Sequence, residues 1–194
     1  MPETEQQIGM DGVKRVRRLL DGTMRFRLPY DVYGSPERVV LPLLPEGERK
    51  HFDLAGDLLD EDGRPSSPIY VESKNVKGAG DQATKFKDFL AHAYSATLRK
   101  TQDLGIDPKL EFMWATTCPW KGDGFREVAA ETALREAIEN ADDNVIPSAH
   151  EPDETILRSL TDRLWVWVIS ERHEDMVLGS QLRGWIAQRL EETA

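Results

Sequence analysis

Residues 51–59 of the chain are His51-Phe52-Asp53-Leu54-Ala55-Gly56-Asp57-Leu58-Leu59, and residues 69–74 are Ile69-Tyr70-Val71-Glu72-Ser73-Lys74. Both segments are rich in apolar residues. Between them, Asp62-Gly63 is a strong signal for a two-residue hairpin turn, because both central positions of such a turn favour positive φ. The sequence therefore predicts two antiparallel strands joined by a turn, and the other elements are interpreted around this hairpin.

The predicted hairpin has one polar face. Side chains alternate across a strand, so every second residue lies on the same side. Phe52 and Leu54 are expected on the apolar face behind. The charged residues that share the polar face are Asp53, Asp57, Glu72 and Lys74.

The register of the hairpin decides which aspartate faces Glu72. If Asp62-Gly63 is the pivot, Asp53 lies opposite Glu72; if the pivot lies nearer Arg64-Pro65, Asp57 does. Both registers stay open, because the loop that follows contains two serines and a proline.

Two or three carboxylates beside a lysine can hold a divalent metal against a phosphodiester and position a water molecule next to it. A Glu-x-Lys triplet alone is weak evidence, and the chain contains a second one at Glu48-Arg49-Lys50, in a polar stretch that is typical of a solvated surface. Glu72-Ser73-Lys74 differs because it ends an apolar strand. The alternative is a pair of strands whose outer face is simply charged.

The segments Phe52-Asp53-Leu54-Ala55-Gly56 and Tyr70-Val71-Glu72-Ser73-Lys74-Asn75 resemble the PD-(D/E)xK phosphodiesterase superfamily, which includes restriction endonucleases and Holliday-junction resolvases. Members often begin the hairpin with Asp-Leu-x-Gly, as Asp53 to Gly56 do here, which favours Asp53 over Asp57 as the first metal ligand. The resemblance implies a restriction-endonuclease-like three-layer core, in which helices flank a mixed β-sheet in an α/β fold.

The resemblance also implies roles for the hairpin residues. Asp53, Glu72 and the Ser73 carbonyl would bind Mg²⁺, for which Mn²⁺ would substitute, and Lys74 would orient the attacking water. Carboxylates this close raise one another's pKa until a cation arrives. Some members add a glutamate on the first helix, and this chain has none there after Gly12.

Further candidates lie on the helix predicted after Asp81. Some relatives place a glutamine there, so Gln82 is a candidate for the catalytic centre or for DNA contact, against a plain surface residue. The candidate nucleic-acid contacts are Lys77, Lys85 and Lys87. A second basic cluster covers the first predicted helix and the segment after it, with Lys14, Arg15, Arg17, Arg18, Arg25 and Arg27.

Composition limits the class of protein. The length of 194 residues predicts one domain spanning 1–194, and the single cysteine, Cys118, excludes an intramolecular disulfide. The net charge of −10 argues against a general nucleic-acid binder. No apolar run approaches the roughly twenty residues of a membrane span, and the chain begins with polar and acidic residues, so we expect a cytoplasmic protein and no membrane partner.

The remaining pattern alternates helices and strands. Helices are expected at 5–20, from about 81, at 124–140, at 155–161 and at 174–192. Strands are expected at 23–27, 39–44, 110–116 and 164–169, and the last is apolar on both faces, as in a central strand.

The sequence and the resemblance together lead us to expect a metal-dependent nuclease, a DNA endonuclease of prokaryotic or phage defence, restriction or repair, with nucleic acid as partner and a homodimer or a larger defence complex as its assembly. The main alternative is a weakly active or silent nuclease-like module that serves as a DNA-binding or structural subunit. A third interpretation is a small-molecule or protein-binding domain, which would bind no metal.

Overall fold

A mixed five-stranded sheet forms the centre of the computed structural model, which describes residues 3–75, 81–118 and 130–170 together with 173, 181, 185, 188 and 189. Its strands in spatial order are β1 (Phe26–Asp31), β4 (Leu54–Leu59), β5 (Pro65–Lys74), β6 (Glu111–Thr116) and β7 (Leu164–Val168). β1, β4 and β5 are antiparallel neighbours, whereas β5, β6 and β7 run parallel.

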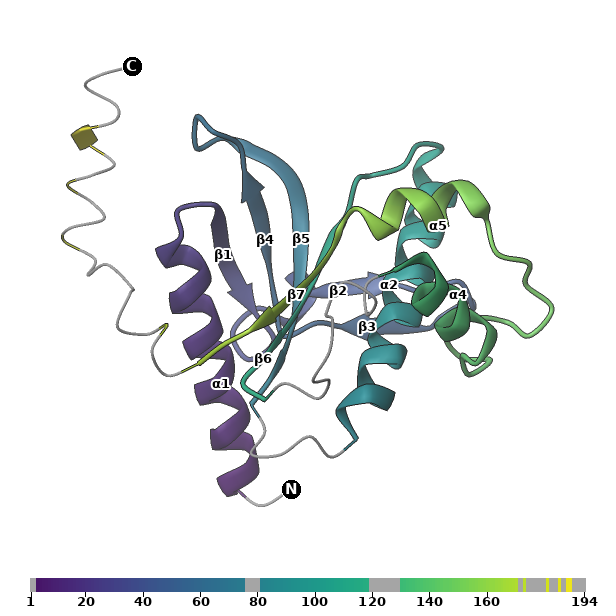
Figure 1. Ribbon diagram of the computed structural model, residues 1–194, viewed down its shortest axis with the longest axis horizontal. Coiled ribbons are helices and arrows are strands. Elements are labelled where there is room, and N and C mark those ends of the chain that lie inside the picture. The colour runs from purple at the N-terminus through teal and green to yellow at the C-terminus, as the bar shows by residue number, and fades with distance from the viewer. Residues whose placement is uncertain are drawn as a thin grey trace.

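Helices cover both faces of this sheet (Figure 1). One face is covered by α1 (Glu3–Gly22), and the other by α2 (Gln82–Leu104), α4 (Glu131–Glu139) and α5 (Glu154–Thr161). The buried hydrophobic residues form two clusters, one on each face of the sheet. Val13 and Leu20 of α1 pack with Val71 on one face, and Phe86 of α2 packs with Phe112 on the other. The prediction of an α/β fold with a mixed sheet flanked by helices is confirmed.

The two long helices follow from their apolar periodicity. α1 buries Val13, Val16 and Leu20, at helical spacing, against the sheet. α2 ends at Gly105, whose φ of 72° is the left-handed conformation that glycine adopts without strain, and whose N–H donates to the Thr101 carbonyl at 2.8 Å. Asp81 stands at the N-cap of α2, as the sequence predicts, although its side chain makes no capping hydrogen bond.

The predicted strand over 51–59 is wrong in one respect, because the chain changes sheets within it. Residues 49–51 form β3 (Arg49–His51), which pairs with β2 (Val40–Pro42) in a separate two-stranded sheet. The Phe52 N–H still donates to Val39 at 2.9 Å, but the Asp53 N–H donates to Val71 of the main sheet at 3.0 Å. This switch sends Phe52 into the α2-side core and Leu54 into the α1-side core, so simple alternation fails across Asp53.

The hairpin turn is also longer than predicted. Gly63 has a φ of 75°, but Asp62 does not take a positive φ. The Asp60 N–H donates to the Arg64 carbonyl at 2.9 Å, and the Asp60 carboxylate accepts from the N–H groups of Asp62 and Arg64. The pairing Leu54↔Val71 nevertheless follows the register of a pivot at Asp62-Gly63, so Asp53 faces Glu72.

Other boundaries differ from the predictions. The strand expected at 23–27 lies at Phe26–Asp31, and a short 3-10 helix, η1 (Pro36–Arg38), precedes β2. β7 was expected to be central, but it is the last strand of the described sheet, and Trp165 on it is 40% exposed. The helix expected at 124–140 is seen as α4, its first part lies outside the described residues, and the helix expected at 174–192 lies largely outside them.

Within the described residues, no helix combines the length and apolar character needed to cross a membrane. The expectation of one domain over 1–194 stays a prediction.

Candidate functional site

Asp53 is fixed at the point where the chain enters the main sheet. Its carbonyl accepts from the Val32 N–H and its own N–H donates to Val71, each at 3.0 Å. Its carboxylate Oδ2 accepts a hydrogen bond from the Ser73 N–H at 2.7 Å. This last bond ties the side chain of Asp53 directly to the strand that carries Glu72 and Lys74.

Glu72 lies on β5 and is buried, with 7% of its surface exposed. Lys74 Nζ donates to Glu72 Oε1 at 2.7 Å. Lys74 also lies over the ring of Trp114, 5.5 Å from its centroid, which holds the lysine against the α2-side core. The face predicted to be polar also carries Tyr70, which packs against the α2-side core, and Glu72 on it is buried.

Lys50 is a third charged partner that sequence reasoning missed. Its Nζ lies 3.2 Å from Glu72 Oε2, although it belongs to the Glu48-Arg49-Lys50 triplet interpreted above as solvated surface. Glu48 and Arg49 are indeed exposed, whereas the Lys50 side chain is only 24% exposed. No local signal marks Lys50, because β3 belongs to a separate sheet and its chain joins the strand beside Glu72 only at Asp53.

The electrostatics of the cluster follow from burial and crowding. Burial first, and then the negative charge of Glu72, raise the pKa of Asp53 from 3.8 to about 6, against the lowering effects of the Ser73 N–H and of Lys74 and Lys50. Burial alone would lower the pKa of Lys74, but Glu72 and Asp53 outweigh it and raise that pKa. The site therefore favours a charged Lys74 and resists a second negative charge.

These oxygens fit a hard divalent cation. Glu72 Oε2 is buried and accepts no hydrogen bond from any described residue, although the Lys50 ammonium forms an ion pair with it at 3.2 Å, so a cation that displaces Lys50 could coordinate this oxygen. Mg²⁺ is commonly bound through one or two carboxylates, with water and substrate phosphates completing the shell. Within the described residues no group of three or more His, Cys, Asp or Glu side chains is arranged for a metal, so Asp53 and Glu72 would be its acidic ligands.

Asp57 is separated from this cluster. It lies on β4, four residues after Asp53, and pairs with Arg27 and Pro68. At the usual rise of a strand, four residues span roughly 13 Å. The register thus decides the alternative left open by the sequence, and it brings Asp53 rather than Asp57 to Glu72.

Gln82 is not a plain surface residue, since it is 1% exposed. Its amide nitrogen donates to the Cys118 carbonyl at 2.9 Å, and its amide oxygen accepts from the Thr116 hydroxyl at 2.7 Å. It ties the start of α2 to the end of β6, next to the strand end that carries Lys74. A role for Gln82 in catalysis or DNA contact stays a prediction.

The candidate nucleic-acid contacts are dispersed. Lys77 lies outside the described residues. Lys85 pairs with Asp81 at 3.0 Å, and Lys87 pairs with Glu136 of α4 at 2.6 Å. In the basic cluster on α1 and the segment after it, Arg17 pairs with Asp31 at 2.7 Å.

Tyr33 lies in the loop after β1. The Asp31 carboxylate orders this loop by accepting from the N–H groups of Tyr33 at 3.0 Å and of Gly34 at 2.7 Å. Burial, followed by the charges of Asp53 and Asp31, raises the pKa of the Tyr33 phenol. Tyr33 is 43% exposed.

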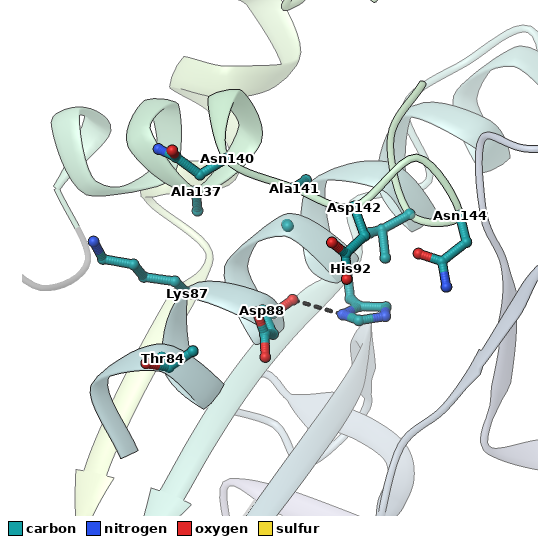
Figure 2. Close-up of a pocket in the computed structure, with 11 residues that line it drawn as sticks. Thr84, Lys87, Asp88, His92, Ala137, Asn140, Ala141, Asp142 and Asn144 are labelled. Carbon is teal, nitrogen blue, oxygen red and sulfur yellow. Dashed lines mark hydrogen bonds between the residues drawn. The ribbon is translucent and has the colours of Figure 1, made fainter. Parts of the chain in front are cut away.

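A pocket of about 270 Å³ lies elsewhere, between α2, α4 and the loop after α4 (Figure 2). His92 lines it, and its Nδ1 contacts the Asp88 carbonyl at 2.6 Å. Burial lowers the pKa of His92, and the charges of Lys50 and Glu72 act on it as well. His92 thus lines the pocket and feels the charges of the cluster, but neither Asp53 nor Glu72 lines the pocket.

No match to this chain is found among models of known protein families, curated proteins or solved structures.

Proposed function

We propose that this protein is a metal-dependent phosphodiesterase of the PD-(D/E)xK type with a restriction-endonuclease-like core, acting on DNA. The observation that carries the proposal is the register of β4 and β5, which sets Asp53 against Glu72 and leaves Lys74 on the same face, 2.7 Å from the Glu72 carboxylate. A strand pair of this kind supplies two hard oxygen ligands and one ammonium within a partly buried site.

The roles follow from the chemistry of each group. Asp53, Glu72 and the Ser73 carbonyl would hold Mg²⁺, which supplies Lewis-acid polarisation of a phosphoryl oxygen. Lys74, whose pKa is raised, stays protonated and can donate to the attacking water and to the negative charge that develops on the phosphate. The Lys74 ammonium lies 5.5 Å from the centroid of the Trp114 ring, a cation–π contact that favours this position of the ammonium.

A weakly active subunit of a larger complex is the second candidate. It is favoured by the small ligand set, since Asp57 lies apart from the cluster and Glu72 is held by two lysines. Such a protein would bind a divalent cation and still need a partner to cleave.

Cleavage of supercoiled plasmid and of single-stranded DNA in Mg²⁺ or Mn²⁺ tests the proposal. Wild type is compared with Lys74→Ala and with Lys109→Ala, an exposed lysine before β6. We expect nicking or linearisation by wild type and by the Lys109 variant, and loss in the Lys74 variant and in EDTA. Cleavage that persists in Lys74→Ala would place the chemistry elsewhere.

Calorimetry with Mn²⁺ separates the two candidates from a domain that binds no metal. The chain contains its own matched control, because Glu48→Gln changes the glutamate of the other, exposed Glu-x-Lys triplet. Binding that is lost in Glu72→Gln and kept in Glu48→Gln, without cleavage by wild type, would favour the silent subunit. Absence of Mn²⁺ binding in wild type would contradict both.

A further inference from the structure

Lys50 reaches the candidate site from outside the main sheet. It lies on β3 opposite Leu41 of β2, and its ammonium lies 5.7 Å from the centroid of the Phe52 ring. Its side chain is 24% exposed, so it is partly buried and partly in contact with solvent. Lys74, by contrast, is carried by the same strand as Glu72.

The two lysines divide the Glu72 carboxylate between them. Lys74 Nζ hydrogen-bonds to Oε1 at 2.7 Å, whereas Lys50 Nζ lies 3.2 Å from Oε2 and 3.4 Å from Oε1. Lys50 therefore stands at the oxygen that accepts no hydrogen bond from the described residues and that a cation would use.

Charge balance makes the Lys50 ammonium and a divalent cation alternative partners of the Glu72 carboxylate. Asp53 and Glu72 carry two negative charges when ionised, and Lys50 and Lys74 carry two positive charges, so these four groups sum to zero. A divalent cation at Glu72 would lie within a few ångströms of the Lys50 ammonium, where like charges repel strongly in a partly buried site. A phosphodiester would bring back a negative charge and give that ammonium a new partner.

We propose that Lys50 is a positioning residue that occupies the Glu72 carboxylate until a divalent cation binds there, and that then holds a phosphate oxygen of the substrate. This inference rests on the proposed function. The ion pair between Lys50 and Glu72 weakens cation binding when no substrate is present. It also couples the binding of cation and substrate, because the ammonium that the cation displaces then pairs with the phosphate.

The different attachments of the two lysines support this division of roles. Lys74 sits two residues from Glu72 on one strand, lies over Trp114, and keeps its short contact to Oε1. The longer distances of Lys50 and its origin in another sheet let its flexible stem move without disturbing β5.

The test is an Mn²⁺ titration of Lys50→Met, which removes the charge and keeps an apolar stem against Phe52. Lys109→Met makes the same charge change at an exposed site, and Lys50→Arg restores a cation. We expect Lys50→Met to bind Mn²⁺ about tenfold more tightly than wild type, because a neighbouring positive charge is gone. Lys109→Met should match wild type.

The second measurement is binding of a short fluorescein-labelled oligothymidylate in Ca²⁺. We expect it to weaken roughly tenfold in Lys50→Met, as for loss of a charged hydrogen bond, and to recover in part in Lys50→Arg. A purely structural role for Lys50 would weaken both ligands together, so opposite signs are the signature of the proposal.

Three results would overturn the inference. If Lys50→Met binds Mn²⁺ no more tightly than wild type while Glu72→Gln abolishes binding, Lys50 does not compete and the proposed metal site survives. If Mn²⁺ tightens but the oligonucleotide is unaffected, Lys50 is a counterion alone. If wild type and all variants fail to bind Mn²⁺, the proposed function fails and this inference with it.

Discussion

The raised pKa of Asp53 predicts that Asp53→Asn stabilises the metal-free protein at neutral pH. An acid whose folded-state pKa is raised binds more protons in the folded than in the unfolded state between the two values, so the folded state loses stability as pH rises through that window. The pKa rises from 3.8 to about 6. A shift of about 2 units corresponds to a destabilisation of the folded state of roughly 3 kcal/mol. This destabilisation is absent below about pH 4 and complete above about pH 6.

The asparagine cannot ionise, but its side-chain oxygen can still accept the Ser73 N–H bond that Asp53 Oδ2 accepts at 2.7 Å. We therefore expect the free energy of unfolding of the variant, minus that of wild type, to grow by about 2–3 kcal/mol as pH rises from about 4 to about 7. Urea unfolding at a series of pH values measures this difference directly.

Two comparisons make the result decisive. Asp57→Asn removes the same charge from the same strand, away from Glu72, and shows what charge removal alone does. Saturating Mn²⁺ should reverse the order by stabilising wild type and not Asp53→Asn, because a ligand stabilises the state that binds it. The electrostatic reasoning would be refuted if, without metal, the difference in unfolding free energy between Asp53→Asn and wild type did not change with pH. It would also be refuted if the variant became less stable than wild type as pH rises.

Two further predictions concern the frame of the site. A Cβ on Gly56 would lie 1.9 Å from the Arg27 carbonyl oxygen of β1, where β1 is irregular, so Gly56→Ala should cost more than about 3 kcal/mol of stability or prevent folding; a urea midpoint close to that of wild type would contradict this close approach. Gln82→Leu should cost roughly 1–3 kcal/mol, because it removes the two buried hydrogen bonds that Gln82 makes to the Cys118 carbonyl and the Thr116 hydroxyl, and should leave Mn²⁺ binding intact; loss of Mn²⁺ binding in a folded variant would instead give Gln82 a direct role at the metal.

The sequence predicted the parts of the site that depend on local order. Glu72 and Lys74 lie two residues apart on one strand, so alternation alone places them on one face. The sequence leaves two registers of the hairpin open, and the pairing of β4 with β5 decides between them by setting Asp53 opposite Glu72. The layered α/β arrangement was also predictable, because apolar periodicity marks the helices and strands.

Other features depend on partners distant in the chain. The periodicity of 51–59 cannot show that Phe52 bonds to β2 while Asp53 bonds to β5, so the faces of Phe52 and Leu54 were misassigned. β7 is apolar on both faces, yet strand order depends on which strand it meets, and it meets only β6 in the described sheet.

The sequence by itself determined that Glu72 and Lys74 share one face of a strand that follows a hairpin turn, because alternation and turns act over a few residues. Only the tertiary structure brought Lys50 to Glu72 and buried that carboxylate under α2, because burial and charge pairing depend on which surfaces meet. The raised pKa of Asp53 belongs to the second group, since it arises from desolvation and from a neighbouring charge on another strand.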